Sequence, residues 1–274
     1  MQIREYSLPA GWYPREAEEV SRFLSDFQRT GPFSRAAVAP HAGWYYSGRI
    51  AARAAACLQP DAQTVIVIGG HLSDSPPLFA MEDAVRTPFG PMRIDGELRG
   101  ALLKSLGGKE DRYRDNTVEV LLPMARYFFP QAEFLWLRLS AQSSSFEAGK
   151  LISREAAKLG RKVDVLASTD LTHYGVNYGF LPQGRGKAAL NWVREVNDAA
   201  FIKAVEAGDS GKVLLCAERD FSACSSGAVL GAMGFAREEG LGNARLLEYS
   251  TSANVHDDED VPDSFVGYAA MAFG

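Results

Sequence analysis

The sequence contains few cysteines and histidines and has no excess of positive charge. Its 274 residues include three cysteines and four histidines, with 29 Lys and Arg against 34 Asp and Glu. A small, odd number of cysteines argues against a disulfide framework. A net charge of -5 gives no electrostatic basis for binding nucleic acid or an anionic membrane, so a small-molecule substrate or a peptide is the favoured partner.

Secretion and membrane-spanning segments are also missing from the sequence. Residues 1–5 have no apolar core of the kind found in a signal peptide, and no apolar run approaches the roughly 20 residues of a membrane helix. We therefore expect a cytoplasmic protein. A hydrophobic content of 46% is enough for a large core, and without a repeat or an obvious linker we predict one domain over residues 1–274.

Short apolar runs alternate with helical patterns along the chain. Buried strands are predicted at 36–39, 64–68, 134–139 and 163–167, with two closing strands at 244–250 and 265–273. Helices are predicted at 17–27, 47–58, 96–106, 145–159, 192–206 and 210–218, with others starting near 115 and 225. This order predicts a three-layer α/β fold, in which a central, mostly parallel or mixed sheet has helices on both faces.

Three of the four histidines follow predicted strands. His41 comes after strand 36–39, His71 after strand 64–68, and His173 after strand 163–167. Because the carboxyl ends of parallel strands share one edge of a sheet, and ligands bind there in open α/β folds, these histidines are predicted to open onto one crevice. His256 belongs to an acidic stretch that we interpret as a solvated loop.

A cysteine completes a candidate metal site. Cys224 precedes a helix of small residues, and a helix N-terminus favours a thiolate. Cys57 and Cys216 belong to apolar helix faces and are interpreted as packed side chains. Two imidazoles and a thiolate suit a transition metal such as Fe(II), Zn(II) or Cu, whereas Mg or Ca would require a shell of oxygen ligands.

Two carboxylates and an aromatic run admit more than one interpretation. Asp170 could orient His173 or a bound water. Glu119 is either a first-turn charge favoured by the helix dipole or a functional group. The run from Trp44 to Tyr46 could wall a pocket or anchor a peptide or protein partner.

A set of short motifs spans nearly the whole chain. The motifs are Ala39-Pro40-His41-Ala42-Gly43, Thr87-Pro88-Phe89-Gly90, Asn116-Thr117-Val118-Glu119, Ser168-Thr169-Asp170-Leu171-Thr172-His173, Cys224 and Gly267-Tyr268-Ala269-Ala270. This set resembles the Memo family, also called AmmeMemoRadiSam system protein B, which is related in fold to the class III extradiol dioxygenases. The resemblance implies metal ligands at His41, His71 and Cys224, with Asp170, His173 and Glu119 lining the same pocket. It also implies association with a radical-SAM protein and a companion small-domain protein.

The sequence thus predicts a metal-binding, dioxygenase-like oxidoreductase that acts on a small molecule. Iron(II) is the favoured ion, with copper or zinc as alternatives. The predicted catalytic residues are His173, as acid or base, with Asp170 and Glu119. The competing hypothesis is a non-catalytic scaffold that binds a peptide or protein partner in the crevice. Metal-dependent hydrolysis is less favoured, because a thiolate ligand reduces the Lewis acidity on which a hydrolytic zinc depends.

Overall fold

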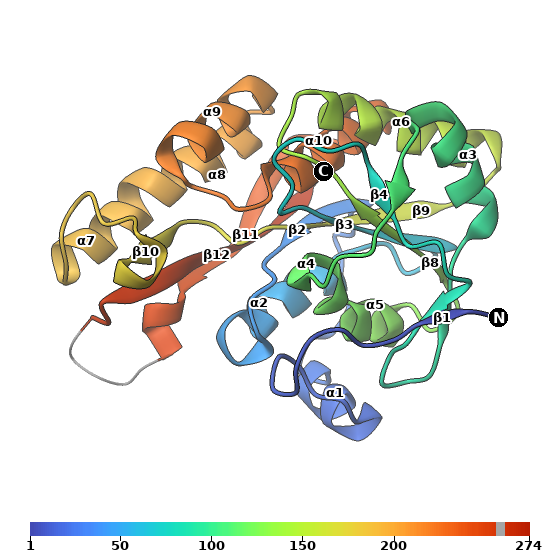
Figure 1. Ribbon diagram of the computed structural model, residues 1–274, viewed down its shortest axis with the longest axis horizontal. Coiled ribbons are helices and arrows are strands. Elements are labelled where there is room, and N and C mark those ends of the chain that lie inside the picture. The colour runs from blue at the N-terminus through green and yellow to red at the C-terminus, as the bar shows by residue number, and fades with distance from the viewer. Residues whose placement is uncertain (256–260) are drawn as a thin grey trace.

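A mixed sheet runs through the centre of the computed structural model, which describes residues 1–255 and 261–274 (Figure 1). In spatial order its strands are β10 (His173–Gly175), β12 (Ser264–Phe273), β2 (Ala36–Ala39), β9 (Val163–Ser168), β3 (Thr64–Gly69), β8 (Glu133–Arg138), β4 (Leu78–Phe79) and β7 (Lys109–Glu110). Strand β11 (Ala244–Thr251) pairs with β12 beside this path. The central strands β2, β9, β3 and β8 are parallel, while β12 and β4 run antiparallel to their neighbours β2 and β8.

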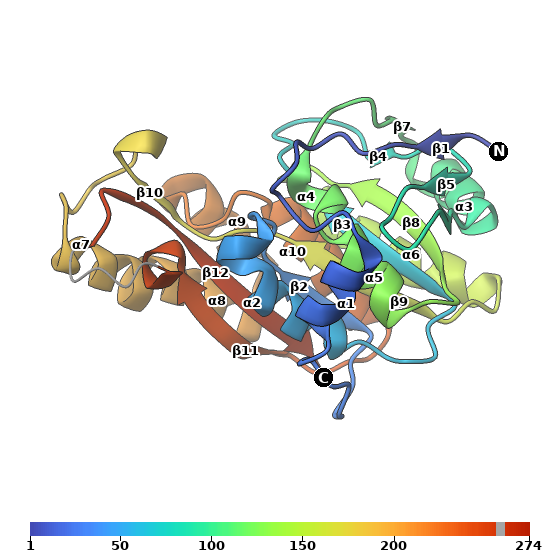
Figure 2. The ribbon, with the colours of Figure 1, turned by 90° about the horizontal axis from the view of Figure 1, so that it is seen from below.

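Helices cover both faces of the sheet, as the two views in Figures 1 and 2 show. One face carries α1 (Ala17–Leu24), α2 (Trp44–Ala56), α4 (Asn116–Glu119) and α5 (Leu122–Phe128). The other carries α3 (Gly96–Leu106), α6 (Ser144–Lys158), α8 (Asp198–Glu206), α9 (Ser210–Asp220) and α10 (Ser226–Glu238). The three-layer α/β prediction is confirmed.

The central strands read as continuous apolar runs because both of their faces are buried. Val65 and Val67 of β3 belong to the core under α2 and α5, whereas Ile66 and Ile68 belong to the core under α6 and α10. Successive strand side chains point to opposite faces of a sheet, so a strand between two helical layers has no polar side. A small separate sheet is formed by β1 (Ile3–Arg4), β5 (Ala84–Val85) and β6 (Met92–Arg93).

Several helix boundaries differ from those predicted. Helix α2 begins at Trp44 rather than Ser47, because the Trp44 ring is buried against Phe23 and its Nε1 donates to the carbonyl of Val120 at 2.9 Å. The helix predicted from residue 115 is divided into α4 and α5, as expected from Pro123, which lacks the amide that would bond to the carbonyl of Glu119.

Other parts of the prediction were too coarse. The helix predicted at 192–206 consists of α7 (Lys187–Trp192), a π-helical turn at Val193–Asn197, and α8. His173 does not sit at the tip of β9 but starts β10, a short strand that pairs with β12. None of the helices in the described ranges has the length and apolar character needed to cross a bilayer. His256 lies outside the described residues.

Candidate metal centre

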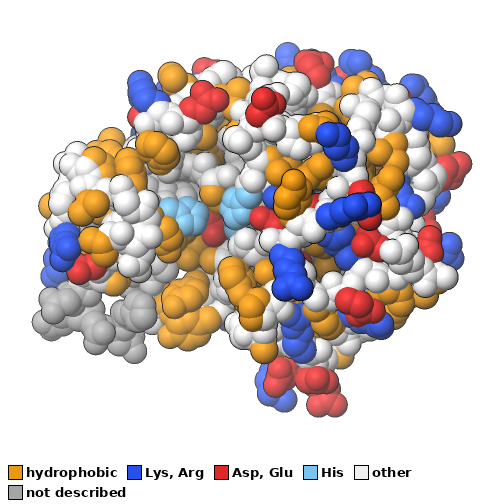
Figure 3. All heavy atoms as spheres, in the orientation of Figure 1, with side chains coloured by type: hydrophobic (Ala, Val, Ile, Leu, Met, Phe, Trp, Pro, Cys, Tyr) orange, Lys and Arg blue, Asp and Glu red, His pale blue; other side chains and the backbone are white. Residues whose placement is uncertain are grey.

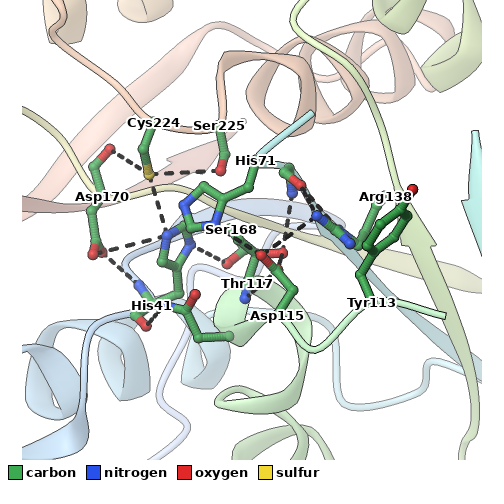
Figure 4. Close-up of polar contacts among 12 residues, drawn as sticks. His41, His71, Tyr113, Asp115, Thr117, Arg138, Ser168, Asp170, Cys224 and Ser225 are labelled. Atoms are coloured by element: carbon green, nitrogen blue, oxygen red, sulfur yellow. Dashed lines mark hydrogen bonds and ion pairs between the residues drawn. The ribbon is translucent and has the colours of Figure 1, made fainter. Parts of the chain in front are cut away.

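Histidine side chains reach the surface in a hollow between the region of β10 and α7 and the main body of the protein (Figure 3). One nitrogen of His41, one nitrogen of His71 and the sulfur of Cys224 all lie within 4.8 Å of one another. The Cys224 Sγ is 3.2 Å from the Nε2 of His41, and the two imidazole rings meet edge to face with centroids 4.9 Å apart (Figure 4). The structure therefore brings together the three predicted metal ligands.

The order of the strands explains this convergence. Strand β9 lies between β2 and β3, so His41 and His71, which each follow their strand by two residues, flank the tip of β9. Cys224 precedes α10, which packs on β2, β9 and β3 from the face of the sheet that also carries α6. Three segments far apart in the sequence thus meet at the carboxyl edge of one parallel sheet.

Two glycines let these segments approach closely. A β carbon on Gly70 would lie 2.3 Å from the Cβ of Ser225, and one on Gly69 would lie 2.2 Å from the Oγ1 of Thr117. Neither space can hold a side chain, so the Gly69-Gly70 pair brings the end of β3 against both the Cys224 loop and the start of α4.

The backbone of His71 adopts a left-handed conformation, with φ of 55°. This region is unfavourable for a residue with a β carbon and requires support from its surroundings. Arg138, which is almost fully buried, donates from Nε and Nη2 to the carbonyl of Gly70 at 3.0 and 2.8 Å. On the other side, the carboxylate of Asp115 lies 2.9 Å from the His71 Nδ1 and 3.4 Å from the Arg138 guanidinium. These contacts hold the His71 ring toward Cys224.

Both imidazoles are oriented through their Nδ1 atoms. The Nδ1 of His41 is 2.8 Å from the hydroxyl of Ser168, the last residue of β9, and the Nδ1 of His71 is bonded to Asp115. Each ring therefore presents its Nε2 to the space shared with Cys224. A carboxylate bonded to the far nitrogen of a histidine is the usual support of a metal ligand, because it fixes the tautomer and raises the basicity of the ring.

The electrostatics of the cluster favour a thiolate. Burial alone would raise the pKa of the Cys224 thiol, but the charge of His41 and hydrogen bonds with His41 and His71 bring this pKa well below its ordinary value. Burial lowers the pKa of His71, and this effect is outweighed by its bonds to Asp115 and Cys224, which raise the pKa to about 10. A thiolate is the form of cysteine that binds metal, and an ion would compete with the protons on the two rings.

The donor set and its dimensions fit a transition metal. With metal–nitrogen bonds of about 2.0–2.1 Å and metal–sulfur bonds of about 2.3 Å, a nitrogen and a sulfur on one tetrahedral ion are about 3.5 Å apart. The observed separation of 3.2 Å between His41 and Cys224 is close to this value. Two imidazoles and one thiolate could thus hold zinc, iron or copper, whereas Mg and Ca require oxygen ligands.

A cavity of about 360 Å³ lies beside the three ligands. Its wall includes Ala42, which follows His41 in the sequence, and Asp170, which contacts His41 and Cys224. The Oδ1 of Asp170 accepts the backbone amide of His41 at 2.7 Å, and its Oδ2 is 3.9 Å from the His41 Nε2. A molecule in this cavity would therefore lie next to an ion bound by His41.

His173 lines the same cavity, where its ring contacts Tyr178 edge to face at 5.0 Å. It remains available as an acid or base toward a ligand in that space. The predicted orienting contact from Asp170 goes instead to His41, because the carboxylate faces the His41 amide.

Glu119 is placed in a different environment from the one predicted. Its carboxylate accepts hydrogen bonds from the amides of Ser7 and Leu8 at 2.8 and 3.1 Å, from the hydroxyl of Tyr13 at 2.8 Å, and from the Ser7 hydroxyl. Arg15 is 3.7 Å away. These partners satisfy the buried carboxylate and fasten the N-terminal segment, so we leave Glu119 out of the proposed chemistry.

The three aromatic residues that follow His41, Trp44, Tyr45 and Tyr46, lie in three different environments. Trp44 is buried and packs in the core, which removes it as an anchor for a partner. Tyr46 lines the cavity, and Tyr45 is 69% exposed. The predicted pocket wall is therefore formed by only one of these three rings.

The chain is similar in sequence to a known family over nearly its whole length. The profile of the family described as Memo-like protein matches residues 4–272. The chain belongs to the Memo family. A MEMO1 family protein of Pyrobaculum arsenaticum is 28% identical to this Memo chain, with 100% of this chain and 99% of the relative covered. One from Methanococcoides burtonii is 32% identical, covering 86% and 84%, and one from Pyrococcus abyssi is 30% identical, covering 97% and 98%.

Three supports of this Memo site were not found from the sequence. Ser168 and Asp115 hold the imidazoles, and Arg138 fixes the turn before His71. Asp115 also caps α4 by accepting the Thr117 amide at 2.8 Å. A charged residue at the end of an otherwise apolar strand, as Arg138 is, was the one available signal.

Proposed function

We propose that this Memo-family protein binds one transition-metal ion through His41, His71 and Cys224 and acts as a dioxygenase-like oxidoreductase on a small molecule. The observation that carries the proposal is the placement of these three donors within 4.8 Å of one another, next to a cavity that Ala42 and Asp170 line. Iron(II) is the proposed ion, with copper and zinc as the alternatives to be tested. When bound, a redox-active ion would supply electron-transfer chemistry that the side chains lack.

The residues of the chain have separate tasks in this proposal. His173 faces the cavity and gives or takes a proton on the bound molecule. Asp170 fixes the backbone of His41 and thereby the position of the ligand ring. His41 is 1% exposed, which excludes bulk water from that side of the centre.

Metal analysis tests the binding part of the proposal. The protein purified without added ions is expected to contain about one equivalent of a transition metal, and His41→Ala and Cys224→Ala are expected to lose it. Cys216→Ala is the matched control, because Cys216 is a buried residue of α9 that packs in the core and does not belong to the cluster. Equal metal content in all four proteins would contradict the proposal.

Oxygen consumption tests the catalytic part. The iron(II)-loaded protein is expected to consume oxygen with at least one member of a panel of catechols and other phenols, and His173→Gln to lower this rate by about 10²–10⁴-fold. A protein that binds the metal but consumes no oxygen would favour the competing scaffold function, in which the exposed Tyr45 contacts a partner.

Family membership supports two further proposals. We propose that the protein associates with a radical-SAM protein and a companion small-domain protein, and that it acts in the cytoplasm. Co-expression of a tagged chain with the radical-SAM protein of the same organism, followed by affinity purification, tests the association. Recovery of the tagged chain alone would contradict it.

A further inference from the structure

We propose that the cavity beside the metal centre selects a small aromatic molecule without an anionic group, such as a neutral phenol or an aromatic amine. The inference deepens the proposed function and rests on it, because the same cavity is taken as the substrate site. The side chains around the cavity indicate the chemical class of the molecule that would bind there.

Aromatic rings from four separate segments surround the cavity. Trp12 comes from the N-terminal segment, Tyr46 from α2, Tyr178 from the turn after β10, and Tyr268 from β12. Tyr178 also packs against His173. Paired aromatic rings attract each other beyond the effect of burying their area, so such a wall favours a flat ring over an aliphatic chain.

The charge of the wall disfavours an anion. Asp170 is the acidic residue of the lining and is 3% exposed, and among the described lining residues there is no Lys or Arg. A phosphate or carboxylate placed here would lose its water without gaining a cationic side chain, and it would face the Asp170 carboxylate.

The polar groups and the size of the cavity fit a small, uncharged or amine-bearing molecule. The amides of Asn116 and Asn177 and the hydroxyls of Ser252 and Ser264 offer neutral hydrogen-bond partners. A volume of about 360 Å³ lies near the lower end of ligand pockets, which span about 300–1,000 Å³. One ring with a short substituent matches this space.

Three probes of nearly equal shape test the inference. Tyramine, 4-ethylphenol and 4-hydroxyphenylacetate share a phenol ring and differ in the charge of a two-carbon tail. Calorimetric titration of the full chain, freed of metal by a chelator, is expected to show the first two binding at least about tenfold more tightly than the carboxylate. 4-Ethylcyclohexanol, which lacks the aromatic ring, is expected to bind more weakly than 4-ethylphenol.

Two variants test whether the lining of the cavity causes this preference for phenols without a carboxylate. Asn177→Lys introduces a cation into the lining and is expected to raise the affinity for 4-hydroxyphenylacetate by about tenfold. Tyr178→Ala is expected to weaken binding of 4-ethylphenol by about tenfold, whereas Tyr45→Ala, which changes an exposed ring outside this lining, is expected to leave it unchanged.

The inference is overturned if the carboxylate binds the chelated protein as tightly as the other two phenols, or if none of the three binds. Failure of the proposed function is a different result. In that case the chain holds no metal in the His41 and Cys224 tests, while the order of the three phenols is unaffected.

Discussion

The sulfur of Cys224 lies 3.2 Å from the Nε2 of His41, although 183 residues separate the two in the sequence. The contact exists because α10 packs across β2 and β9, and because Ser168 at the tip of β9 holds the other nitrogen of the His41 ring. The candidate centre is therefore a product of the strand order, and disturbing the packing of these elements should affect metal binding even where no ligand is changed.

Replacing Asp115 with Asn should weaken metal binding without unfolding the protein. The variant keeps an oxygen that can accept the Thr117 amide, so α4 retains its cap, but it removes the carboxylate that supports His71. Metal affinity is expected to fall by about 10–100-fold, measured by competition with a chromogenic chelator.

The matched control is Asp209→Asn, which changes the same kind of cap at the start of α9, where Asp209 accepts the Lys212 amide. This variant should bind metal like the unmodified protein. If Asp115→Asn binds metal equally well, the support that we assign to Asp115 is wrong.

Gly70→Ala should separate the His71 turn from the Cys224 loop. The new methyl group would lie 2.3 Å from the Cβ of Ser225 and 2.8 Å from its Cα, so one of the two segments must move. We expect a loss of about 1–3 kcal/mol in the free energy of unfolding together with weaker metal binding. Urea denaturation and metal titration measure the two effects.

Gly100→Ala serves as the comparison, because nothing lies within 4 Å of a β carbon at this position in α3. Alanine is favoured over glycine inside a helix, so this variant is expected to be about 0.5–1 kcal/mol more stable. Equal behaviour of the two variants would refute the close approach at Gly70.

Glu119→Gln should lower stability and leave metal content unchanged. The carboxylate accepts hydrogen bonds from Ser7, Leu8 and Tyr13, whereas the NH2 group of a glutamine would face these same donors without being able to accept from them. We expect the free energy of unfolding to fall by about 2–3 kcal/mol. Limited proteolysis should then cut the N-terminal segment faster. Glu16→Gln, at an exposed position in the same segment, is the control and should change stability by less than about 0.5 kcal/mol. Loss of metal from Glu119→Gln would restore the original prediction of a functional role.

Asp164 should make the protein less stable as the pH rises toward neutrality. Burial in β9 raises the pKa of this carboxyl to about 7 from its usual 3.8, despite an ion pair with Arg35 at 3.1 Å. Between about pH 4 and pH 7 the folded chain therefore binds this proton more tightly than the unfolded chain, and stability falls as the pH rises through that window.

Asp164→Asn removes this titration. Its free energy of unfolding relative to the unmodified protein should increase by about 4 kcal/mol between pH 4 and pH 8, which corresponds to a pKa difference of about three at 1.36 kcal/mol for each pKa unit. Asp61→Asn changes the other, exposed partner of Arg35 and should not reproduce this gain. Urea denaturation at several pH values measures both variants, and parallel profiles for Asp164→Asn and the unmodified protein would contradict the assignment.

The strands were predictable from the sequence because burial on both faces leaves an uninterrupted apolar run, as in residues 64–68. The proposed ligands His41 and His71 were identified by a related argument, since both follow such runs. His173 follows the same pattern in sequence, but the chain continues for four residues beyond β9 before His173 starts a strand of its own.

Contacts between distant segments were beyond the sequence. Nothing in the local pattern shows that Asp115 reaches His71, or that Glu119 turns toward Ser7 instead of the crevice. A helix start looks the same whether its carboxylate caps a turn, holds a neighbouring segment or takes part in chemistry. The partner is decided by the strand order and by which segments glycines such as Gly70 allow to approach.

The wall of the cavity combines segments that lie far apart in the sequence, since Trp12 precedes α1 and Tyr268 belongs to β12. The compartment is therefore complete only after β12 has docked beside β2. A variant that lacks residues 1–15, or one that lacks residues 264–274, should consequently lose recognition of a small molecule even though it retains every proposed metal ligand.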